Sequence, residues 1–396
     1  MRSAVPKLCI ILAVENLTHS LLGAALAELA LPVGATTAQR RVFFAVGIIA
    51  ANLPDADLLY SNITPEPLGY LLHHRGHTHT VAGVVVQALL VGAVCLLPVI
   101  RRAVGSLRRR LWALIAISLL GHLVLDSWNS YGVHPFWPLD VRWYYGDAIY
   151  IMEPWLWMLL GVAATLNTRT DRGRVVLGLV LAALAGALAW FGMIPVGALV
   201  AVVVAALALA ATTYRWAPRR RSGVALALTA LFVGAMFGLR ERVRARVVTA
   251  IAPATRGAIV DVVLSPQAAN PLCWAALVVA TNEPAGEYVT TRGTASAFGS
   301  VGCGSTHATA VVWTEPLRQS LLALRELDRR YCAVHAWMQF GRAPEMAEGA
   351  IGDLRYGGAR RENFSTMRLP PSDQAARCPP HLTGWGMPRA DLLHHS

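Results

Sequence analysis

Long apolar runs dominate the first part of this chain, and they limit the folds that it can adopt. A helix of about 20 apolar residues spans the roughly 30 Å of hydrocarbon in a bilayer. Runs of this kind lie at Leu17–Val33, Val42–Tyr60, Val81–Ile100, Leu111–Trp128, Ile151–Leu166, Val175–Phe191, Ile194–Tyr214 and Val224–Leu239. The composition agrees, since 55% of the residues are hydrophobic and only 15% are charged. The sequence therefore predicts an α-helical polytopic membrane protein with about eight spans.

Arginine clusters between these runs predict how the helices are oriented. The chain has 35 lysine and arginine residues against 23 aspartate and glutamate residues. The clusters are Arg40–Arg41, Arg101–Arg110, Arg169–Arg174 and Arg215–Arg221. Basic connections stay in the cytoplasm, so residues 55–80, residues 126–153 and everything after the last run are expected outside. A further basic run, Arg240–Arg246, then also lies outside, where it is expected to contact lipid headgroups. In a membrane protein this charge indicates topology, and no nucleic-acid partner is expected.

The final third of the chain has a different pattern. Short β-rich runs separated by turn residues begin near Ile259, and Pro316–Arg330 has helical periodicity. We therefore expect a transmembrane helical domain at residues 1–246 and a small soluble, extracytoplasmic α+β domain at residues 247–396. This region holds the four cysteines Cys273, Cys303, Cys332 and Cys378. They suit one or two disulfides in an oxidising compartment, with the pairing open.

A histidine cluster lies between two of the apolar runs, within Leu71–Thr80. It contains His73, His74, His77 and His79, with Arg75 among them. Imidazole is a common metal ligand, and an arginine can hold an anionic group through two parallel hydrogen bonds. The cluster thus predicts a metal site with an anion-binding arginine. A pH-sensing patch without metal is the alternative.

Further candidate ligands lie on both sides of this cluster. His122 and Asp126 are four residues apart in a predicted helix, so both side chains project from one face and can bind one cation. A His–Asp hydrogen bond that joins two helices is the other interpretation. Asp55 and Asp57 follow Pro54 in a turn and could bind one ion jointly or two ions separately. His19 lies on the first apolar run, where a lone histidine is usually an ordinary buried residue.

The segment after Asp126 brings more polar groups to the same predicted face. Asn129 and His134 could be ligands or could support ligands, and Asp147 and Glu153 add two carboxylates. Glu153 precedes a proline, and it could instead cap the next helix because acids at helix N-termini complement the helix dipole. The tryptophans of this segment are typical of an interfacial belt.

Together these elements resemble the YdjM-like family of bacterial inner-membrane proteins, which are regarded as metal-dependent hydrolases. The matching elements are Leu17–Gly23, Pro54–Asp57, His74–His79, Gly121–His122 with Asp126, Gly146–Trp155, Asn270–Trp274 and Gly352–Tyr356. The family usually has aspartate where this chain has Glu153. The resemblance implies a protein of the bacterial inner membrane with a metal-dependent hydrolytic site.

A looser similarity suggests the chemistry. The order His, Asp, His and then His-x-x-x-Asp is similar to the ligand order of zinc-dependent phospholipase C and the P1-type nucleases. Those enzymes build multi-zinc phosphoesterase sites on helices. The corresponding positions here are His19, Asp55, His74 or His79, His122 and Asp126. This similarity implies a divalent metal, zinc first, with one to three ions.

The sequence thus predicts a membrane-bound metal-dependent hydrolase, a phosphoesterase that acts on a lipid or lipid-linked substrate at the outer face. The expected metal ligands are His19, Asp55, Asp57, His74, His79, His122 and Asp126, with Arg75 and Asp57 in catalytic roles. Further candidates are His73, His77, Asn129, His134, Asp147 and Glu153.

Two other functions stay open. One is a metal or proton transporter, although the last three runs offer almost no polar groups. The other is a scaffold or stress-response protein with a closed structural metal site.

Overall fold

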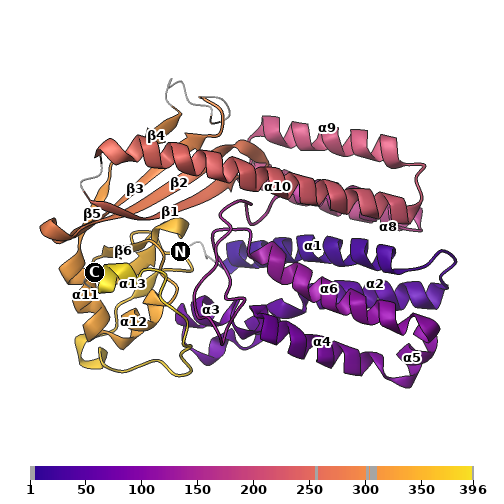
Figure 1. The fold of residues 1–396 in the computed structure, drawn as a ribbon, viewed down its shortest axis with the longest axis horizontal. Coiled ribbons are helices and arrows are strands. Elements are labelled where there is room, and N and C mark those ends of the chain that lie inside the picture. The colour runs from indigo at the N-terminus through magenta and orange to yellow at the C-terminus, as the bar shows by residue number, and fades with distance from the viewer. Residues whose placement is uncertain (1–4, 255–256, 300–302, 304–309, 395–396) are drawn as a thin grey trace.

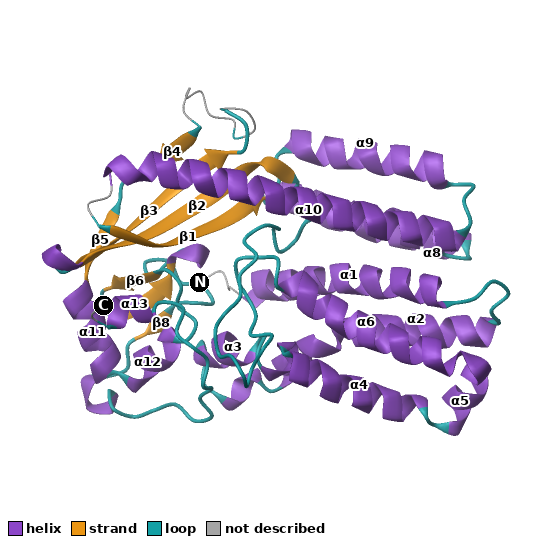
Figure 2. Ribbon diagram, in the orientation of Figure 1, coloured by secondary structure: helices purple, strands orange, loops and turns teal. Residues whose placement is uncertain are grey.

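A helical layer and a β-sheet domain lie at opposite ends of an elongated molecule (Figures 1 and 2). The computed structural model describes residues 5–254, 257–299, 303 and 310–394. Its helical layer contains α1 (Val5–Ala30), α2 (Thr37–Asn52), α3 (Leu68–His73), α4 (Val81–Cys95), α5 (Pro98–Val104), α6 (Arg108–Asp126), α7 (Pro154–Asn167), α8 (Asp171–Trp190), α9 (Val196–Thr213) and α10 (Pro218–Ile251). The long segment between α6 and α7 runs beside the sheet domain without a helix.

Fewer helices can cross a membrane than the apolar runs suggested. Within the described residues, four helical segments are long and apolar enough, and these are Thr37–Ile63, Asp171–Trp190, Val196–Thr213 and Pro218–Ile251. A fifth span arises if Leu68–His79 and Val81–Cys95, which are bent by 68°, form one broken span. The prediction of about eight spans is therefore wrong. Helix α7 has only 14 residues, and α6 begins with three arginines. Both helices have many side chains buried inside the bundle, and hydropathy alone cannot separate such core helices from lipid-facing ones.

The outer helices have the apolar surface that a bilayer requires. Only Leu188 is buried in α8, and only Val202 and Thr213 are buried in α9. Many of their other apolar side chains are exposed, where water would make them unfavourable and lipid would not. They are Val175, Val176, Leu179 and Val180 of α8, and Val196, Val200, Val203, Val204 and Leu207 of α9. These helices identify the chain as a membrane protein.

The four basic connections lie together at the end of the helical layer that is far from the sheet (Figure 1). Arg110 donates to the carbonyl oxygen of Ala30 over 3.4 Å, which joins the start of α6 to the end of α1. The Nδ2 atom of Asn167 donates to Ser222 Oγ over 2.9 Å, which joins the end of α7 to the start of α10. Arginines predicted to share one side of the membrane therefore share one end of the protein.

The C-terminal region forms two small sheets with helices against them. The first sheet contains β1 (Ala258–Gln267), β2 (Asn270–Asn282), β3 (Glu287–Ser296), β4 (Val311–Trp313) and β5 (Leu317–Ser320), with all pairs antiparallel. The second contains β6 (Pro344–Ala347), β7 (Ala350–Asp353) and β8 (Met367–Arg368). The helices are α11 (Leu321–Arg330), α12 (Cys332–Met338) and α13 (Ala390–Leu393). The predicted helix over Pro316–Arg330 begins later than expected, because Leu317–Ser320 pairs with β3 as a strand and Ser320 then caps α11.

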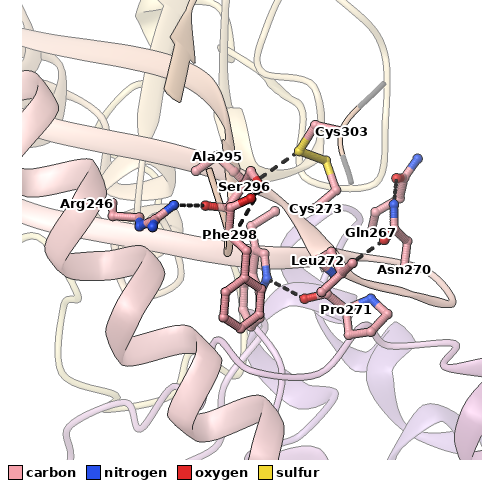
Figure 3. Close-up of a disulfide and its surroundings, with 11 residues drawn as sticks. Arg246, Gln267, Asn270, Pro271, Leu272, Cys273, Ala295, Ser296, Phe298 and Cys303 are labelled. Carbon is pink, nitrogen blue, oxygen red and sulfur yellow. Dashed lines mark hydrogen bonds between the residues drawn. A yellow bond between two sulfur atoms is a disulfide. The ribbon is translucent and has the colours of Figure 1, made fainter. Parts of the chain in front are cut away.

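Helix α10 links the two parts of the molecule. Its 34 residues extend about 51 Å, which exceeds the thickness of the hydrocarbon core. The last turns pack on one face of the sheet, where Val243 and Val247 join Trp274 in a buried apolar cluster. Arg242 donates to the carbonyl oxygen of Ala297 over 3.1 Å. Arg246 donates to the carbonyl oxygen of Ser296 over 3.1 Å (Figure 3). The basic run that we expected to contact lipid headgroups therefore binds the end of β3.

Two disulfides cross-link the sheet domain. Cys273 in β2 is bonded to Cys303, which follows β3 in the chain (Figure 3). Cys332 at the start of α12 is bonded to Cys378. All four cysteines that the sequence assigned to an oxidising compartment are thus paired.

Candidate metal centre

Four side chains from separate parts of the helical layer converge at the end that faces the sheet domain. They are Asp55 from the 3-10 helix after α2, His79 from the 3-10 turn before α4, and His122 and Asp126 from the last turns of α6. One ligand atom from each lies within 4.8 Å of the others. His79 and His122 are fully buried and Asp126 is almost so. A group of this composition could hold a metal ion.

Local sequence explains why these side chains meet. Helix α2 ends at Asn52, just before Pro54, which has no N–H group to continue the helical bonding and starts a 3-10 helix that carries Asp55. Thr80 caps α4, since its Oγ1 accepts a hydrogen bond from Gly83 N over 2.8 Å, and this fixes the turn that holds His79. His122 and Asp126 need no turn, because residues four apart share one face of a helix.

The separations within the group match a tetrahedral ion. The Nε2 atom of His79 lies 3.3 Å from an oxygen of Asp55 and 3.1 Å from an oxygen of Asp126. The Nε2 atom of His122 lies 3.4 Å from each of the same two oxygens, and the two Nε2 atoms are 3.0 Å apart. A tetrahedral zinc with arms of about 2.0–2.1 Å would separate neighbouring ligand atoms by about 3.3–3.4 Å. The donor set and its spacing therefore fit a zinc-like cation.

The other nitrogen of each imidazole is already used. His122 Nδ1 lies 2.7 Å from the carbonyl oxygen of Ala51, so this nitrogen carries the proton and donates. His79 Nδ1 lies 3.1 Å from a carboxylate oxygen of Asp57. When Nδ1 donates to an oxygen, Nε2 of the neutral ring presents a lone pair, as a metal-bound histidine must. Two such lone pairs facing two carboxylates repel one another unless a cation, or protons on these nitrogens, lie between them.

Asp57, predicted as both a ligand and a catalytic group, lies behind His79. One of its oxygens accepts from Thr78 Oγ1 and from Arg75 N, both over 2.9 Å, and also contacts His79 Nδ1. Its other oxygen lies 3.2 Å from Nδ1 of His74. Asp57 and His74 form a second group with Asp55 in which ligand atoms lie within 4.8 Å. The geometry thus places Asp57 in contact with a ligand of the first group, with a second ion as the other arrangement that these atoms allow.

His19 and Arg75 contact the Oδ1 atom of Asp126, whereas its Oδ2 atom faces His79 and His122. His19 Nε2 lies 3.3 Å from Oδ1, and the His19 ring stacks on His122 with centroids 3.8 Å apart. Arg75 Nη2 lies 3.2 Å from the same oxygen, and Arg75 Nη1 donates to Asn129 Oδ1 over 3.0 Å. Because Arg75 is fully buried, its guanidinium balances the charge of Asp126. The predicted contact of Arg75 with an anionic substrate stays a prediction.

The remaining candidates lie outside this group. His73 bonds Thr64, with 2.8 Å between Nε2 and Oγ1, while His77 is exposed and packs on Trp137. His134 is buried between two tryptophans, and burial lowers its pKa to about 3, so the ring is neutral. Two of the later candidates contact Arg75: Asn129 accepts from its guanidinium over 3.0 Å, and His134 Nδ1 lies 3.4 Å from its carbonyl oxygen.

Asp147 and Glu153 bind the C-terminal domain. Arg342 donates through both Nη atoms to the two oxygens of Asp147, each over 2.8 Å, and also contacts Asp261 on β1 over 2.7 Å. The motif around Asp147 drew attention to the residue, but nothing in the sequence pairs it with Arg342, which is almost 200 positions away in the chain. The docking role of Arg342 was therefore missed.

Glu153 joins α7 to the tip of the β1–β2 hairpin. Its Oε1 atom accepts from Trp155 N at the start of α7 and from Ala269 N in the hairpin, each over 3.2 Å. The expectation that Glu153 caps the next helix agrees with this contact. Burial raises the pKa of this carboxyl from its ordinary 4.5 to about 8, so the neutral acid is the favoured form at neutral pH.

This pKa predicts a pH dependence of stability. A carboxyl that binds its proton more tightly when folded stabilises the fold fully below pH 4.5, and this contribution is lost as the pH rises through about 8. We expect the melting temperature of the purified protein to fall between pH 5 and pH 9 more steeply than that of Glu153→Gln. The glutamine keeps the accepting oxygen but does not titrate. Glu153→Ala removes the cap, and it should be about 1–2 kcal/mol less stable than Glu153→Gln at every pH. Equal slopes for wild type and Glu153→Gln would contradict the assignment.

The fold and this group define a polytopic membrane protein with buried histidine and aspartate side chains that could hold a metal ion. Residues 14–198 match the YdjM inner membrane protein family. The resemblance to this family that the sequence motifs indicated is therefore confirmed over this segment, and with it a location in the membrane. The predicted matches at Asn270–Trp274 and Gly352–Tyr356 lie outside the matched segment and stay predictions. All members of the four-residue group lie within the matched segment.

Parts of the chain also resemble two bacterial proteins. The inner membrane protein YbcI of Escherichia coli strain K12 is 36% identical over 110 residues, which are 27% of this chain and 60% of YbcI. The uncharacterized protein YfhP of Bacillus subtilis strain 168 is 25% identical over 144 residues, which are 36% of this chain and 42% of YfhP. The matched stretches thus span less than two thirds of either relative. No solved structure matches the chain.

Proposed function

We propose that this protein is a membrane-bound metal-dependent hydrolase, a phosphoesterase that acts on a lipid or lipid-linked substrate at the outer face of the membrane. The observation that carries the proposal is the convergence of Asp55, His79, His122 and Asp126 at separations suited to one divalent cation. Zinc is the first candidate, because imidazole nitrogens and carboxylate oxygens are among its usual ligands.

The residues of such a site would have two roles, to bind the ion and to orient the ligands. His79 and His122 present Nε2, and the two carboxylates supply negative charge. Behind them, Asp57 and the carbonyl oxygen of Ala51 fix the ring orientations through Nδ1. A bound divalent ion would polarise a phosphoryl oxygen and lower the pKa of its water from 15.7 to about 7.

A small hollow leads to this group. It is lined by His19, Asp126 and Asn129, together with Ile149 and Tyr150 of the segment before α7. Asp126 therefore borders a space of about 20 Å³, while its partner His122 is enclosed. A space of this size can hold a water molecule beside the candidate ligands.

A closed structural metal site in a scaffold protein is the second candidate. Four protein ligands already complete a tetrahedron, whereas a catalytic zinc usually keeps one position for water. The two candidates differ in one property, since only a hydrolase exchanges a protein ligand for water or substrate. Asp55 is the ligand best placed to leave, because its side chain is 9% exposed while both histidines are fully enclosed.

Metal analysis and an ester assay distinguish the two. The protein purified in detergent is expected to hold at least one zinc per chain. It should also hydrolyse a chromogenic phosphodiester such as bis(p-nitrophenyl) phosphate, with activity lost on chelation and restored by zinc. Metal retained in a protein that is inert toward mono- and diesters would favour the scaffold. A protein that binds no divalent metal would overturn both candidates.

The outer location rests on two independent features. The basic connections lie at the end opposite the candidate site, and basic connections stay in the cytoplasm (Figure 1). The C-terminal domain contains two disulfides, which persist in oxidising compartments. We expect a thiol-reactive, membrane-impermeant reagent to label a cysteine placed at exposed Leu322 in intact cells with a permeable outer envelope. A cysteine placed at Val33, in the α1–α2 connection, should stay unlabelled, and the reverse pattern would invert the topology.

Replacing Asp57 with asparagine tests its orienting role. The amide keeps the size of the side chain but weakens the contact with His79 Nδ1, so metal affinity should fall by about 10–100-fold. Competition with a fluorescent zinc chelator measures this change. If the zinc count instead falls by one ion of two, Asp57 is a ligand of a second ion with His74 and Asp55.

A further inference from the structure

A large cavity lies between the candidate metal centre and the β-sheet domain. Its volume is about 470 Å³, which is in the range of small-molecule binding sites. One wall is the segment from Asn129 to Met152, and the opposite wall is the face of the first sheet that carries Val263 and Leu277. The other face of that sheet is covered by α10. The cavity therefore exists only because the C-terminal domain sits over the outer end of the helical layer.

The cavity wall on the membrane side is apolar. Ile149, Ile151 and Met152 contribute side chains, and so does Met193 from the connection between α8 and α9. These two helices are lipid-facing, and Phe191 next to Met193 is 60% exposed. A hydrocarbon chain can therefore lie along this wall and continue to the level of the bilayer surface.

Polar groups without hydrogen-bond partners also line the cavity. The hydroxyl of Tyr131, the hydroxyl of Tyr356 and the Nε atom of Arg355 are buried, line the cavity and have no hydrogen-bond partner among the described residues. The Arg355 side chain is only 2% exposed, and its Nη1 donates to Ser130 O over 2.8 Å, which holds it beside this segment. Buried donors of this kind cost about 1–3 kcal/mol each when they bond nothing. Such a cost is expected where a ligand supplies the acceptor.

A second arginine adds positive charge to the same cavity. Arg292 on β3 lines it and donates Nη2 to the carbonyl oxygen of Leu354 over 3.0 Å. Unlike Arg355, which is paired with Asp353, Arg292 has no carboxylate partner within the part of the chain that the structure describes. One uncompensated cation and three open donors favour an anionic head group.

The cavity adjoins the hollow at the candidate metal centre. Asn129, Ile149, Tyr150 and Ile151 line both spaces. Asn129 also accepts the hydrogen bond from Arg75, which contacts Asp126. A head group near Tyr131 and Arg355 would therefore lie beside the segment that borders the candidate ligands.

We propose that this cavity binds a single-chain anionic amphiphile. Its chain lies along Ile149, Ile151, Met152 and Met193, and its anionic head accepts hydrogen bonds from Tyr131, Tyr356 and Arg355. The inference rests on the proposed function in that the bound amphiphile is the substrate, or the part of it that remains after cleavage. The binding itself requires no hydrolysis and is tested separately.

The test is binding of hexyl phosphate, a soluble anionic amphiphile. Radiolabelled hexyl phosphate is dialysed to equilibrium against the full-length protein in nanodiscs, with empty nanodiscs as the blank. We expect saturable binding that excess inorganic phosphate or hexanol displaces at least about 10-fold less well than unlabelled hexyl phosphate, because each offers only half of the contacts. Binding equal to the blank, or equal competition by inorganic phosphate, would overturn the proposal.

Removal of the two hydroxyls locates the site. Tyr131→Phe with Tyr356→Phe deletes only atoms that bond nothing in the protein, so folding should be unaffected. The double variant should bind hexyl phosphate about 10-fold more weakly or worse, since a hydrogen bond to a charged group contributes about 1.5–3 kcal/mol. Tyr214→Phe, at the exposed end of α9, is the matched control and should bind as wild type does. Unchanged affinity in the double variant would overturn the proposal.

Failure of this inference differs from failure of the proposed function. Hexyl phosphate binding that depends on the two hydroxyls, in a protein that hydrolyses no phosphoester, would leave the cavity assignment standing and remove the hydrolase. If the protein shows metal-dependent hydrolysis but its affinity for hexyl phosphate is unchanged by loss of the two hydroxyls, the hydrolase stands and the cavity assignment is removed.

Discussion

The His122→Ala variant is expected to lose its metal ion and its phosphodiesterase activity together. The imidazole supplies one of four candidate ligand atoms, and its Nε2 lies 3.0 Å from that of His79. Loss of a group that only orients a ligand typically costs 10–100-fold in metal affinity. Loss of a ligand itself should therefore cost more than about 100-fold. Zinc per chain by elemental analysis and initial rates on bis(p-nitrophenyl) phosphate measure the two effects.

His77→Ala is the matched control for His122→Ala. His77 belongs to the same histidine cluster of the sequence, but its side chain is exposed and packs on Trp137 and Trp385. The control should keep zinc and activity within about twofold of wild type, since a surface substitution away from special features changes stability by at most about 0.5 kcal/mol. If His122→Ala keeps its zinc while His77→Ala loses it, the candidate centre is assigned to the wrong histidines. If neither variant loses zinc, the metal is not bound by the four-residue group, and the group of Asp55, Asp57 and His74 becomes the candidate.

The ligand pair on α6 could be predicted from the sequence because its geometry is local. Residues four apart on a helix share a face, so the spacing of His122 and Asp126 was enough to predict that their side chains lie together. Asp55 and His79 lie far from His122 in the chain, so their approach to it could not be derived from local geometry. Only the presence of polar residues between apolar runs suggested that they meet. The sequence could not show that Asp55 belongs to the four-residue group while Asp57 contacts His79 from behind. Which of two carboxylates in one turn faces a cation depends on the 3-10 geometry after Pro54, and the chain shows this only once folded.

Span number was overestimated for a physical reason. An apolar run is favourable both in lipid and in the centre of a helical bundle, so hydropathy responds to both in the same way. Helix α7 shows the difference, since eight of its 14 residues are buried against neighbouring helices. Helix α8, with a similar composition, has only Leu188 buried. The grouping of the basic connections at one end was less affected, because arginines mark the ends of helices whether or not each helix spans.

Contacts between the two parts of the chain were also invisible in the sequence. Asp147 and Glu153 were noticed as carboxylates near the site, but their partners, Arg342 and Ala269, lie 195 and 116 positions away. Nothing local distinguishes a carboxylate that binds a metal from one that binds an arginine of another domain. The same docking creates the cavity over the site, so its existence could not be predicted either.

Replacing Arg342 with alanine should have the largest effect on stability of any single change outside the candidate centre. The Arg342 side chain is 5% exposed and bonds Asp147 and Asp261, whose side chains are 1% and 11% exposed. Removal of the arginine leaves the buried Asp147 carboxylate without its cation, and leaves Asp261 with only the longer contact to Arg389, 3.5 Å away. Breaking a buried pair in this way costs about 3–5 kcal/mol. Thermal unfolding of the purified variant measures the loss, and Arg318→Ala is the control because its ion pair with Glu287 is exposed and worth at most about 1 kcal/mol.

The same substitution should also weaken the candidate centre, although Arg342 contacts none of its ligands. Asp147 is tied to Asn129, whose carbonyl oxygen accepts from Asp147 N over 3.4 Å, and the Asn129 side chain accepts from Arg75. Release of Asp147 therefore loosens the segment that holds Arg75 against Asp126. We expect Arg342→Ala to lower zinc affinity as well as stability, while Asp147→Asn with Asp261→Asn in the Arg342→Met background restores much of the stability by removing the unpaired charges. Full zinc affinity in an Arg342→Ala protein of lowered stability would show that the C-terminal domain does not support the centre.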